Sequence, residues 1–182
     1  LGGARYMDAA AGKPFGFDRP PDDRTVAPDV LNFSRIILLR ETLVEHGLDT
    51  MPLWASEWGW NSLPGDWRGE PSIWGSVNSE QQAAYTLGAL DRAEREWPWL
   101  TGMALYTWQP NAPADDAHWG FTMQSASGET TPLFDALAAR PIAEAARNGL
   151  YAPDNPYAAY SGMWRFGPLG ADIGDRQDSQ AL

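Results

Sequence analysis

The sequence contains no cysteine. Disulfide bonds, thiol nucleophiles and thiolate metal sites are therefore excluded, and cysteine usage does not indicate a redox compartment. The chain also lacks an apolar run long enough to span a bilayer, and residues 1–18 lack the basic and apolar regions of a signal peptide. Neither membrane insertion through this segment nor a targeting signal within it is expected.

Basic residues are scarce compared with acidic ones. The chain has 13 Lys and Arg against 24 Asp and Glu, a formal net charge of −11. Such a charge does not attract a phosphate backbone or an anionic lipid surface, so neither nucleic acid nor a membrane is an expected partner. Phosphate loops, zinc patterns and dinucleotide fingerprints are absent as well. Asp115, Asp116 and His118 are interpreted as a solvated acidic loop, so no metal or cofactor is expected, and nothing sets the oligomeric state.

Tryptophan, by contrast, is abundant. Ten tryptophans occur in 182 residues, and nine of them fall between Trp54 and Trp119. The indole has a flat apolar face and one polar edge, which suits a hydrophobic core and also the face of a sugar ring. The length of 182 residues suits one domain but is too short for a complete (β/α)₈ barrel of about 250 residues.

Helical and strand-like patterns alternate along the chain. Such alternation predicts parallel strands joined by helical crossovers, with reactive groups at the carboxyl ends of the strands. The elements expected are a helix over 29–46, a strand over 51–56, a helix over 79–96 opened by a Ser79–Gln82 capping box, a strand over 102–108 and a helix over 131–139.

Glu57 is the most informative residue. It follows the apolar residues Leu53, Trp54 and Ala55, where its carboxylate should project into the mouth of the sheet. A carboxylate there is costly unless it is paired, hydrated or used in chemistry. A salt bridge to an arginine or simple hydration therefore stands beside a catalytic role.

Two segments resemble strands seven and eight of the clan A glycoside hydrolases, and more narrowly their bacterial cellulase-like or xylosidase-like members. The segments are residues 54–61 (WASEWGWN) and 105–109 (LYTWQ). The resemblance implies an α/β fold, the C-terminal part of a (β/α)₈ TIM barrel with about strands six to eight. It implies Glu57 as the nucleophile of a retaining hydrolase of β-linked poly- or oligosaccharides, and Trp108 as the floor of the sugar subsite.

Other segments extend the resemblance to roughly residues 4–140. Residues 118–121 (HWGF) and 128–137 resemble the family's closing loop and final helix. Residues 12–22 resemble the end of strand six, where the family often carries His-Pro-Tyr; Lys13 and Phe15 depart from that pattern. A secreted or cell-surface location is implied by the same resemblance.

Further residues are candidates for substrate binding, and each has a structural alternative. At least one of Trp58 and Trp60 is expected to touch sugar, whereas Trp54 is expected in the core. Tyr106 either orients Glu57 or is a buried structural residue. The remaining candidate contacts are Asn61, which also suits a turn, Gln109, Trp119 and His118.

The second carboxylate of a retaining site is missing. Such sites pair a nucleophile with an acid/base carboxylate about 5 to 5.5 Å away, which in this clan belongs to an Asn-Glu pair. No Asn-Glu dipeptide occurs in the chain. The chain is therefore interpreted as a partial barrel (1–147) followed by a linker and a truncated β-rich accessory module (148–182), which alone would neither fold tightly nor cleave glycosides. The alternative is a non-catalytic carbohydrate-binding protein that uses its Trp-rich edge.

Overall fold

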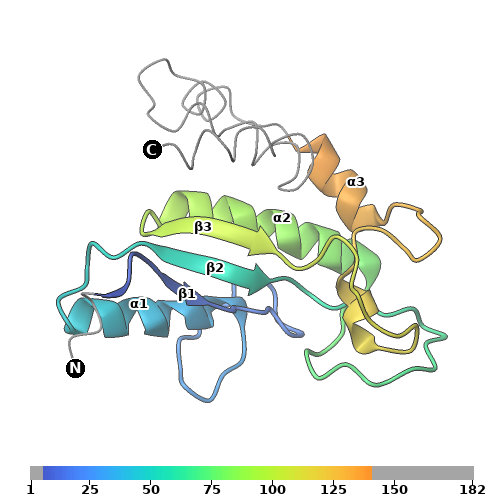
Figure 1. Ribbon diagram of the computed structural model, residues 1–182, viewed down its shortest axis with the longest axis horizontal. Coiled ribbons are helices and arrows are strands. Elements are labelled where there is room, and N and C mark those ends of the chain that lie inside the picture. Colours follow the sequence, from blue (N-terminus) through green and yellow to red (C-terminus); the bar gives the residue numbers. More distant parts are fainter. Residues whose placement is uncertain (1–5, 141–182) are drawn as a thin grey trace. The chain divides into compact units, whose positions relative to one another are not determined.

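The computed structural model describes residues 6–140. The accessory module expected over 148–182 lies outside these residues. Helices and strands alternate as the sequence predicts (Figure 1). The elements are β1 (Ala10–Gly12), η2 (Phe33–Arg35), α1 (Ile36–Glu45), β2 (Leu53–Trp58), α2 (Ser79–Glu96), β3 (Leu100–Leu105), η3 (Ala117–Phe121) and α3 (Pro132–Ala139).

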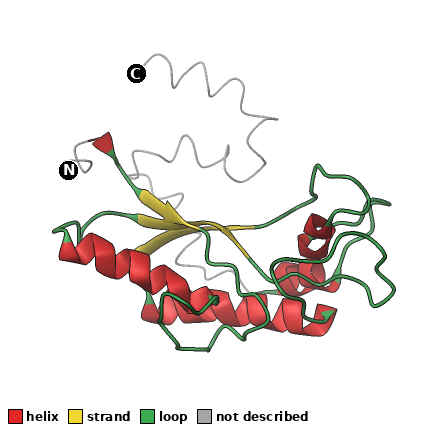
Figure 2. Ribbon diagram, turned by 90° about the horizontal axis from the view of Figure 1, so that it is seen from below, coloured by secondary structure: helices red, strands yellow, loops and turns green. Residues whose placement is uncertain are grey.

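The three strands form one parallel sheet in the order β1-β2-β3. Figure 2 shows α1 and α2 on the same face of this sheet. Strands in chain order, with their crossover helices on one face, are the arrangement of a (β/α) barrel, whereas a doubly wound sheet carries helices on both faces. The described residues thus form a mixed α/β unit that corresponds to part of a barrel. No helix among them is long and apolar enough to cross a membrane.

The core lies between the sheet and the two long helices. Leu53 and Ala55 of β2 are fully buried against it. Phe33 is at its centre, with its ring centroid 5.8 Å from that of Trp58, 5.8 Å from that of Trp60 and 5.0 Å from that of Trp97. The rings are tilted by 31° to 46° to one another, and at these separations they bury large apolar areas. Several of the clustered tryptophans are therefore core residues.

The opposite face of the sheet is open among the described residues. Trp54, which was expected in the core, is 46% exposed, and Thr101 and Ala104 of β3 are exposed as well. The expectation for Trp54 is wrong because the strand alternates, and the two neighbours of Trp54 already point to the helices. A Cβ atom on Gly102 would lie 2.7 Å from the Trp54 ring, so the indole lies across this glycine. Parallel sheets are normally covered on both faces.

The capping box differs by one residue from the expectation. Asn78, not Ser79, is the N-cap of α2: its side chain accepts a hydrogen bond from the Gln81 amide at 2.7 Å, and Gln81 Oε1 accepts one from the Asn78 amide at 3.1 Å. Gln82 is thereby released into the interior, where Nε2 donates to the carbonyls of Trp60 and Gly120, each at 2.7 Å. It thereby satisfies the Trp60 carbonyl and adds a second donor to the Gly120 carbonyl, which also accepts from the Ser62 amide.

Candidate functional site

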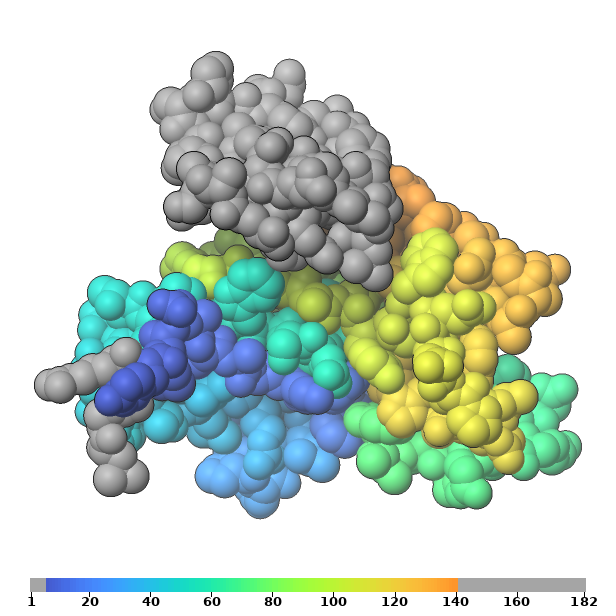
Figure 3. Space-filling model, in the orientation of Figure 1, coloured from blue at the N-terminus to red at the C-terminus, as the bar shows by residue number. Residues whose placement is uncertain are grey.

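The segments that follow the three strands meet at one edge of the sheet, toward which the arrowheads point in Figure 1. The Gly16 amide donates to the Gly59 carbonyl at 3.0 Å, and the Tyr106 amide donates to the Trp58 carbonyl at 2.9 Å. Ser62 and Gly120 are also hydrogen-bonded, at 2.8 Å. In Figure 3 the loops around 60–75 and 110–125 accordingly form one continuous surface beside this edge.

A bulge in β2 sets the direction of Glu57. Ala55 pairs with Met103 and Trp58 with Leu105, so β2 uses three steps where β3 uses two. Strict alternation from the buried Ala55 would send Glu57 into the core. The extra residue instead places Trp58 in the core and leaves the Glu57 side chain 35% exposed. Bulges commonly re-aim a side chain in this way.

Gly59 makes the turn that follows Trp58. Its φ of +147° is one that side-chain-bearing residues rarely adopt, and a Cβ atom there would lie 3.1 Å from the Tyr106 carbonyl oxygen. The glycine therefore lets the ends of β2 and β3 approach each other closely beside Glu57.

Glu57 forms an ion pair with Lys13, which follows β1. Lys13 Nζ lies 2.7 Å from Glu57 Oε1, and the two side chains are 59% and 35% exposed. The open alternative of a salt bridge is thus realised with a lysine rather than an arginine. Lys13 is the only lysine in the 182-residue chain, and it lies in the segment where the sequence departs from His-Pro-Tyr.

Tyr106 lies within electrostatic reach of Glu57. Burial raises the pKa of the Tyr106 phenol, and the negative charges of Glu57 and Asp116 raise it further, whereas Lys13 lowers it. The charges of Glu57, Asp116 and Lys13 therefore all act on one phenol. A phenol whose pKa is raised stays protonated at neutral pH and can donate a hydrogen bond.

An aromatic cluster lines the same edge. The Tyr106 ring centroid lies 6.0 Å from that of Phe15 and 5.9 Å from that of His118, and the His118 ring is 4.7 Å from Trp74. The ring centroid of Phe121 lies 5.2 to 5.5 Å from those of Phe15, Trp74 and Tyr106. Sequence reasoning did not select Trp74, which lies in the long loop between β2 and α2; its only signal was membership of the tryptophan-rich region.

Asp116 holds His118 in this cluster. The Asp116 carboxylate accepts a hydrogen bond from the His118 amide at 2.8 Å and contacts His118 Nδ1 at 2.5 Å. These interactions with the backbone and side chain of His118 lower the pKa of the Asp116 carboxyl. Among residues 6–140 there is no group of three side chains suited to hold a metal ion.

Three other candidates lie on the loops that follow β3. Trp108 is 50% exposed, and its ring packs edge-on against Phe134 of α3, with centroids 5.6 Å apart. Gln109 Nε2 donates to the Ser125 carbonyl at 2.9 Å, and Trp119 Nε1 donates to the Pro113 carbonyl at 2.8 Å. Trp108 therefore presents a large apolar surface to solvent, whereas the polar groups of Gln109 and Trp119 are engaged within the loop.

The structure corrects the expectation that a sugar contacts Trp58, Trp60 or Asn61. Their exposed fractions are 1%, 1% and 0%, so none presents a surface to a sugar. The bulge turns Trp58 into the core. Trp60 Nε1 donates to the Arg19 carbonyl at 2.7 Å, and Asn61 Nδ2 donates to the Ala117 carbonyl at 2.8 Å. These residues support the site from beneath instead of contacting a ligand.

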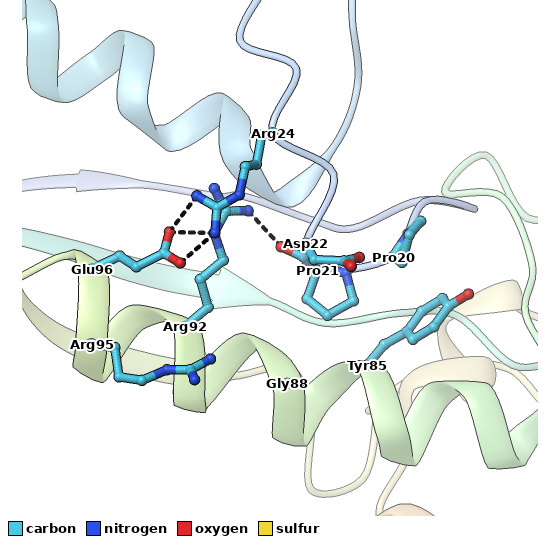
Figure 4. Close-up of a pocket in the computed structure, with 9 residues that line it drawn as sticks. All are labelled: Pro20, Pro21, Asp22, Arg24, Tyr85, Gly88, Arg92, Arg95 and Glu96. Carbon is cyan, nitrogen blue, oxygen red and sulfur yellow. Dashed lines mark hydrogen bonds and ion pairs between the residues drawn. The ribbon is translucent and has the colours of Figure 1, made fainter.

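A hollow of about 320 Å³ lies elsewhere, between the loop of residues 20–24 and α2 (Figure 4). Its wall contains Glu96, whose two carboxylate oxygens bind Arg24 at 2.5 and 2.8 Å and whose Oε2 also binds Arg92 at 3.0 Å. The two guanidinium groups lower the pKa of Glu96 to about 2. None of the residues predicted to form the sugar site lines this hollow. The ion pair between Arg24 and Glu96 joins the loop to α2.

Solved structures with a similar fold include glycoside hydrolases. No family model and no curated protein matches the chain. A family 39 glycoside hydrolase from the gut symbiont Bacteroides cellulosilyticus is similar to it with a TM-score of 0.55 and 18% identity, over 76% of this chain and 28% of that enzyme. The chain thus spans little more than a quarter of that enzyme's length.

Two further structures align less closely. A β-1,4-mannanase of family GH113 has a TM-score of 0.42 and 18% identity, over 77% of this chain and 42% of that one. A β-glucuronidase from Bifidobacterium dentium, in complex with coumarin-3-O-glucuronide, has a TM-score of 0.45 and 14% identity, over 75% and 21% of the two chains. The likeness to the family 39 enzyme supports the coarser expectation, a mixed α/β unit like part of a TIM barrel; that this part is strands six to eight stays a prediction.

Proposed function

We propose that Glu57 is the nucleophile of a retaining glycoside hydrolase and that this chain supplies about strands six to eight of its barrel. The observation that carries the proposal is the bulge in β2, which turns Glu57 out of the core at the carboxyl end of the middle strand. Strand-end positions on this face are where barrel enzymes keep their reacting groups. The open face with Trp54 would then be the inner side of the barrel, which the other strands cover.

In this mechanism the Glu57 carboxylate attacks the anomeric carbon and the glycosidic oxygen leaves, which forms a covalent glycosyl-enzyme. Water then attacks the same carbon and releases Glu57. Protonation of the leaving oxygen and deprotonation of the water require a second carboxylate, which in this proposal comes from strand four, outside the chain. The protonated phenol of Tyr106 would donate a hydrogen bond near the reacting carboxylate.

The proposed substrate is a β-linked poly- or oligosaccharide. Trp108, with its exposed indole, is proposed as the main sugar-stacking surface. Trp74, which contacts His118, is proposed as a second aromatic contact with the sugar. His118, Gln109 and Trp119 remain proposed contacts at the rim. A secreted or cell-surface location is part of the same proposal.

Replacement of Glu57 tests the role of this residue in the full-length natural polypeptide that carries the sequence. Glu57→Ala should reduce turnover of β-glycosides by about 10⁴- to 10⁶-fold, the range seen when a member of a catalytic unit is removed, while the fold and the affinity for substrate are kept. Glu80→Ala, which changes an exposed glutamate at the start of α2, is the matched control and should leave turnover unchanged. Near-normal turnover in the Glu57 variant would refute the assignment.

A second candidate is a carbohydrate-binding protein without chemistry. It is favoured by the Lys13–Glu57 ion pair, which neutralises the carboxylate. Under this alternative the natural polypeptide binds glycans but does not hydrolyse them, and Glu57→Ala alters only binding. The same pair of variants therefore separates the two functions.

A further inference from the structure

The cation beside Glu57 is unusual for this chain. Lys13 is its single lysine, in a protein with a net charge of −11. The side chain is 59% exposed, and among the interactions of residues 6–140 its Nζ atom has one partner, Glu57. An ammonium group has three N–H donors, so the contact with Glu57 does not use all of them.

A lysine ammonium beside the nucleophile is unfavourable for cleavage of a neutral sugar. The transition state of glycoside cleavage resembles an oxocarbenium ion, which carries positive charge at the anomeric carbon. A lysine ammonium 2.7 Å from the attacking carboxylate repels that charge and competes for the electron pair that must form the new bond. Electrostatic groups in an active site are expected to favour the charge that develops, not to oppose it.

Both difficulties disappear if the substrate brings its own negative charge. We propose that the sugar bound at Glu57 carries an anionic substituent, a carboxylate or a sulfate ester, which takes Lys13 from Glu57 and so frees the nucleophile. This inference names the substrate class of the proposed function and rests on it. The positive charge of Lys13 is then neutralised by the substrate, and the Glu57 electron pair becomes available for attack.

The positions of the neighbouring charges fit this reading. Attack requires the anomeric carbon within about 3.5 Å of the carboxylate, so the substituents of the same sugar ring come within reach of a flexible lysine stem. Lys13 also borders a hollow of about 170 Å³ whose only other charged residue is Arg35. The Oδ1 atom of the nearby Asp116 carboxylate is engaged by His118. The overall charge of −11 disfavours a long polyanion, so the expected ligand is a short glycan with one charged sugar.

Binding of matched methyl glycosides to the full-length natural polypeptide tests the proposal. The probes are methyl β-glucuronide, methyl β-glucoside carrying a sulfate ester on its primary hydroxyl, uncharged methyl β-glucoside, and the corresponding galacto-configured set, each measured by titration calorimetry. An anionic probe should bind roughly 10 to 100 times more tightly than its neutral counterpart, the range of one charge-assisted hydrogen bond. Whether carboxylate or sulfate is preferred identifies the substituent.

Variants at the ion pair sharpen the test. Lys13→Met should abolish the preference for the anionic probe, and Lys13→Arg should retain most of it because the charge is kept. Glu57→Gln removes the competing carboxylate, so it should tighten binding of the anionic probe by several fold while neutral probes are unaffected. If Lys13 had only a structural role, Lys13→Met would not abolish the preference for the anionic probe and Glu57→Gln would not tighten binding of that probe.

The inference is overturned if neutral and anionic probes bind equally, if no anionic probe binds at millimolar concentration, or if Lys13→Met keeps the preference. Binding to the Glu57→Gln variant does not depend on turnover. A preference for anionic sugar together with normal turnover of Glu57→Ala would therefore refute the nucleophile assignment and leave the binding inference standing.

Discussion

The Nζ atom of Lys13 lies 2.7 Å from the Oε1 atom of Glu57 and joins the ends of two neighbouring strands. The pair determines what the edge of the sheet can do. It leaves Glu57 Oε2 as the carboxylate oxygen not taken by the lysine, and it places a cation at the proposed sugar site. The catalytic proposal and the inference about substrate charge both begin from this contact.

The burial of Trp58 and the exposure of Trp108 predict opposite effects of truncation. Trp58→Ala should lower the free energy of unfolding by about 3 to 5 kcal/mol, because it opens a cavity beside Phe33. Trp108→Ala should cost much less stability but weaken glycan binding. Urea denaturation and glycan titration of both variants measure the difference. The assignment of Trp58 to the core would be wrong if its truncation left stability unchanged and abolished binding.

Gly59 predicts a local backbone effect. Its φ of +147° is strained for any residue with a side chain, and a Cβ atom 3.1 Å from the Tyr106 carbonyl oxygen would be crowded. Gly59→Ala should therefore destabilise the fold by about 1 to 3 kcal/mol, and it should also impair the site because the ends of β2 and β3 move apart. Gly65→Ala is a suitable control, since a Cβ atom there meets nothing within 4 Å. Equal effects of the two substitutions in thermal denaturation would contradict this reading.

Glu96 predicts a dependence of stability on pH. Its pKa falls from 4.5 to about 2 in the folded protein because Arg24 and Arg92 bind the carboxylate. A carboxyl whose folded pKa is lowered contributes stability above its unfolded pKa, and that contribution is lost as pH falls toward the folded value. The thermal midpoint should accordingly drop between about pH 4.5 and pH 2.

Glu96→Gln isolates this contribution. The variant should be less stable than the wild type near pH 6, and the gap should narrow as the pH approaches 2. Asp23 has a lowered pKa as well, because the Thr25 amide and Arg19 donate to its carboxylate. The acid transition of the variant should therefore be reduced, not removed. Parallel pH curves for wild type and Glu96→Gln would show that the pair with Arg24 and Arg92 has no such role.

The sequence predicted most elements well because their signals are local, although the helix expected over 29–46 begins only at Ile36, after the 3-10 turn η2. Hydrophobic periodicity and strand-length apolar runs located α2, β2 and β3 to within a few residues. The cap of α2 was misplaced by one residue because Asn78 and Ser79 can each serve as an N-cap. Only the conformation of the chain shows that Gln81, and not Gln82, reaches back to the cap.

The contents of the site were harder to predict. Alternation along a strand would have sent either Glu57 or Trp58 to the core, and the bulge that decides between them depends on pairing with β3. Trp74 and Lys13 enter the site from loops distant in sequence, so no local pattern marks them. Trp60 and Asn61 belong to the motif that predicted sugar contacts, but they are buried under the segments that carry Arg19 and Ala117.

Covalent trapping tests the central claim most directly. A fluorinated glycoside with a dinitrophenyl leaving group reacts with a glycosidase nucleophile without protonation of the leaving group, and its glycosyl-enzyme hydrolyses slowly. Incubated with the full-length natural polypeptide, neutral and anionic forms of this reagent should yield, by mass spectrometry, one added glycosyl group that peptide mapping locates on Glu57. The Glu57→Gln variant should remain unlabelled. Absence of labelling, or labelling of another residue in the wild type, would contradict the assignment of Glu57 as the nucleophile.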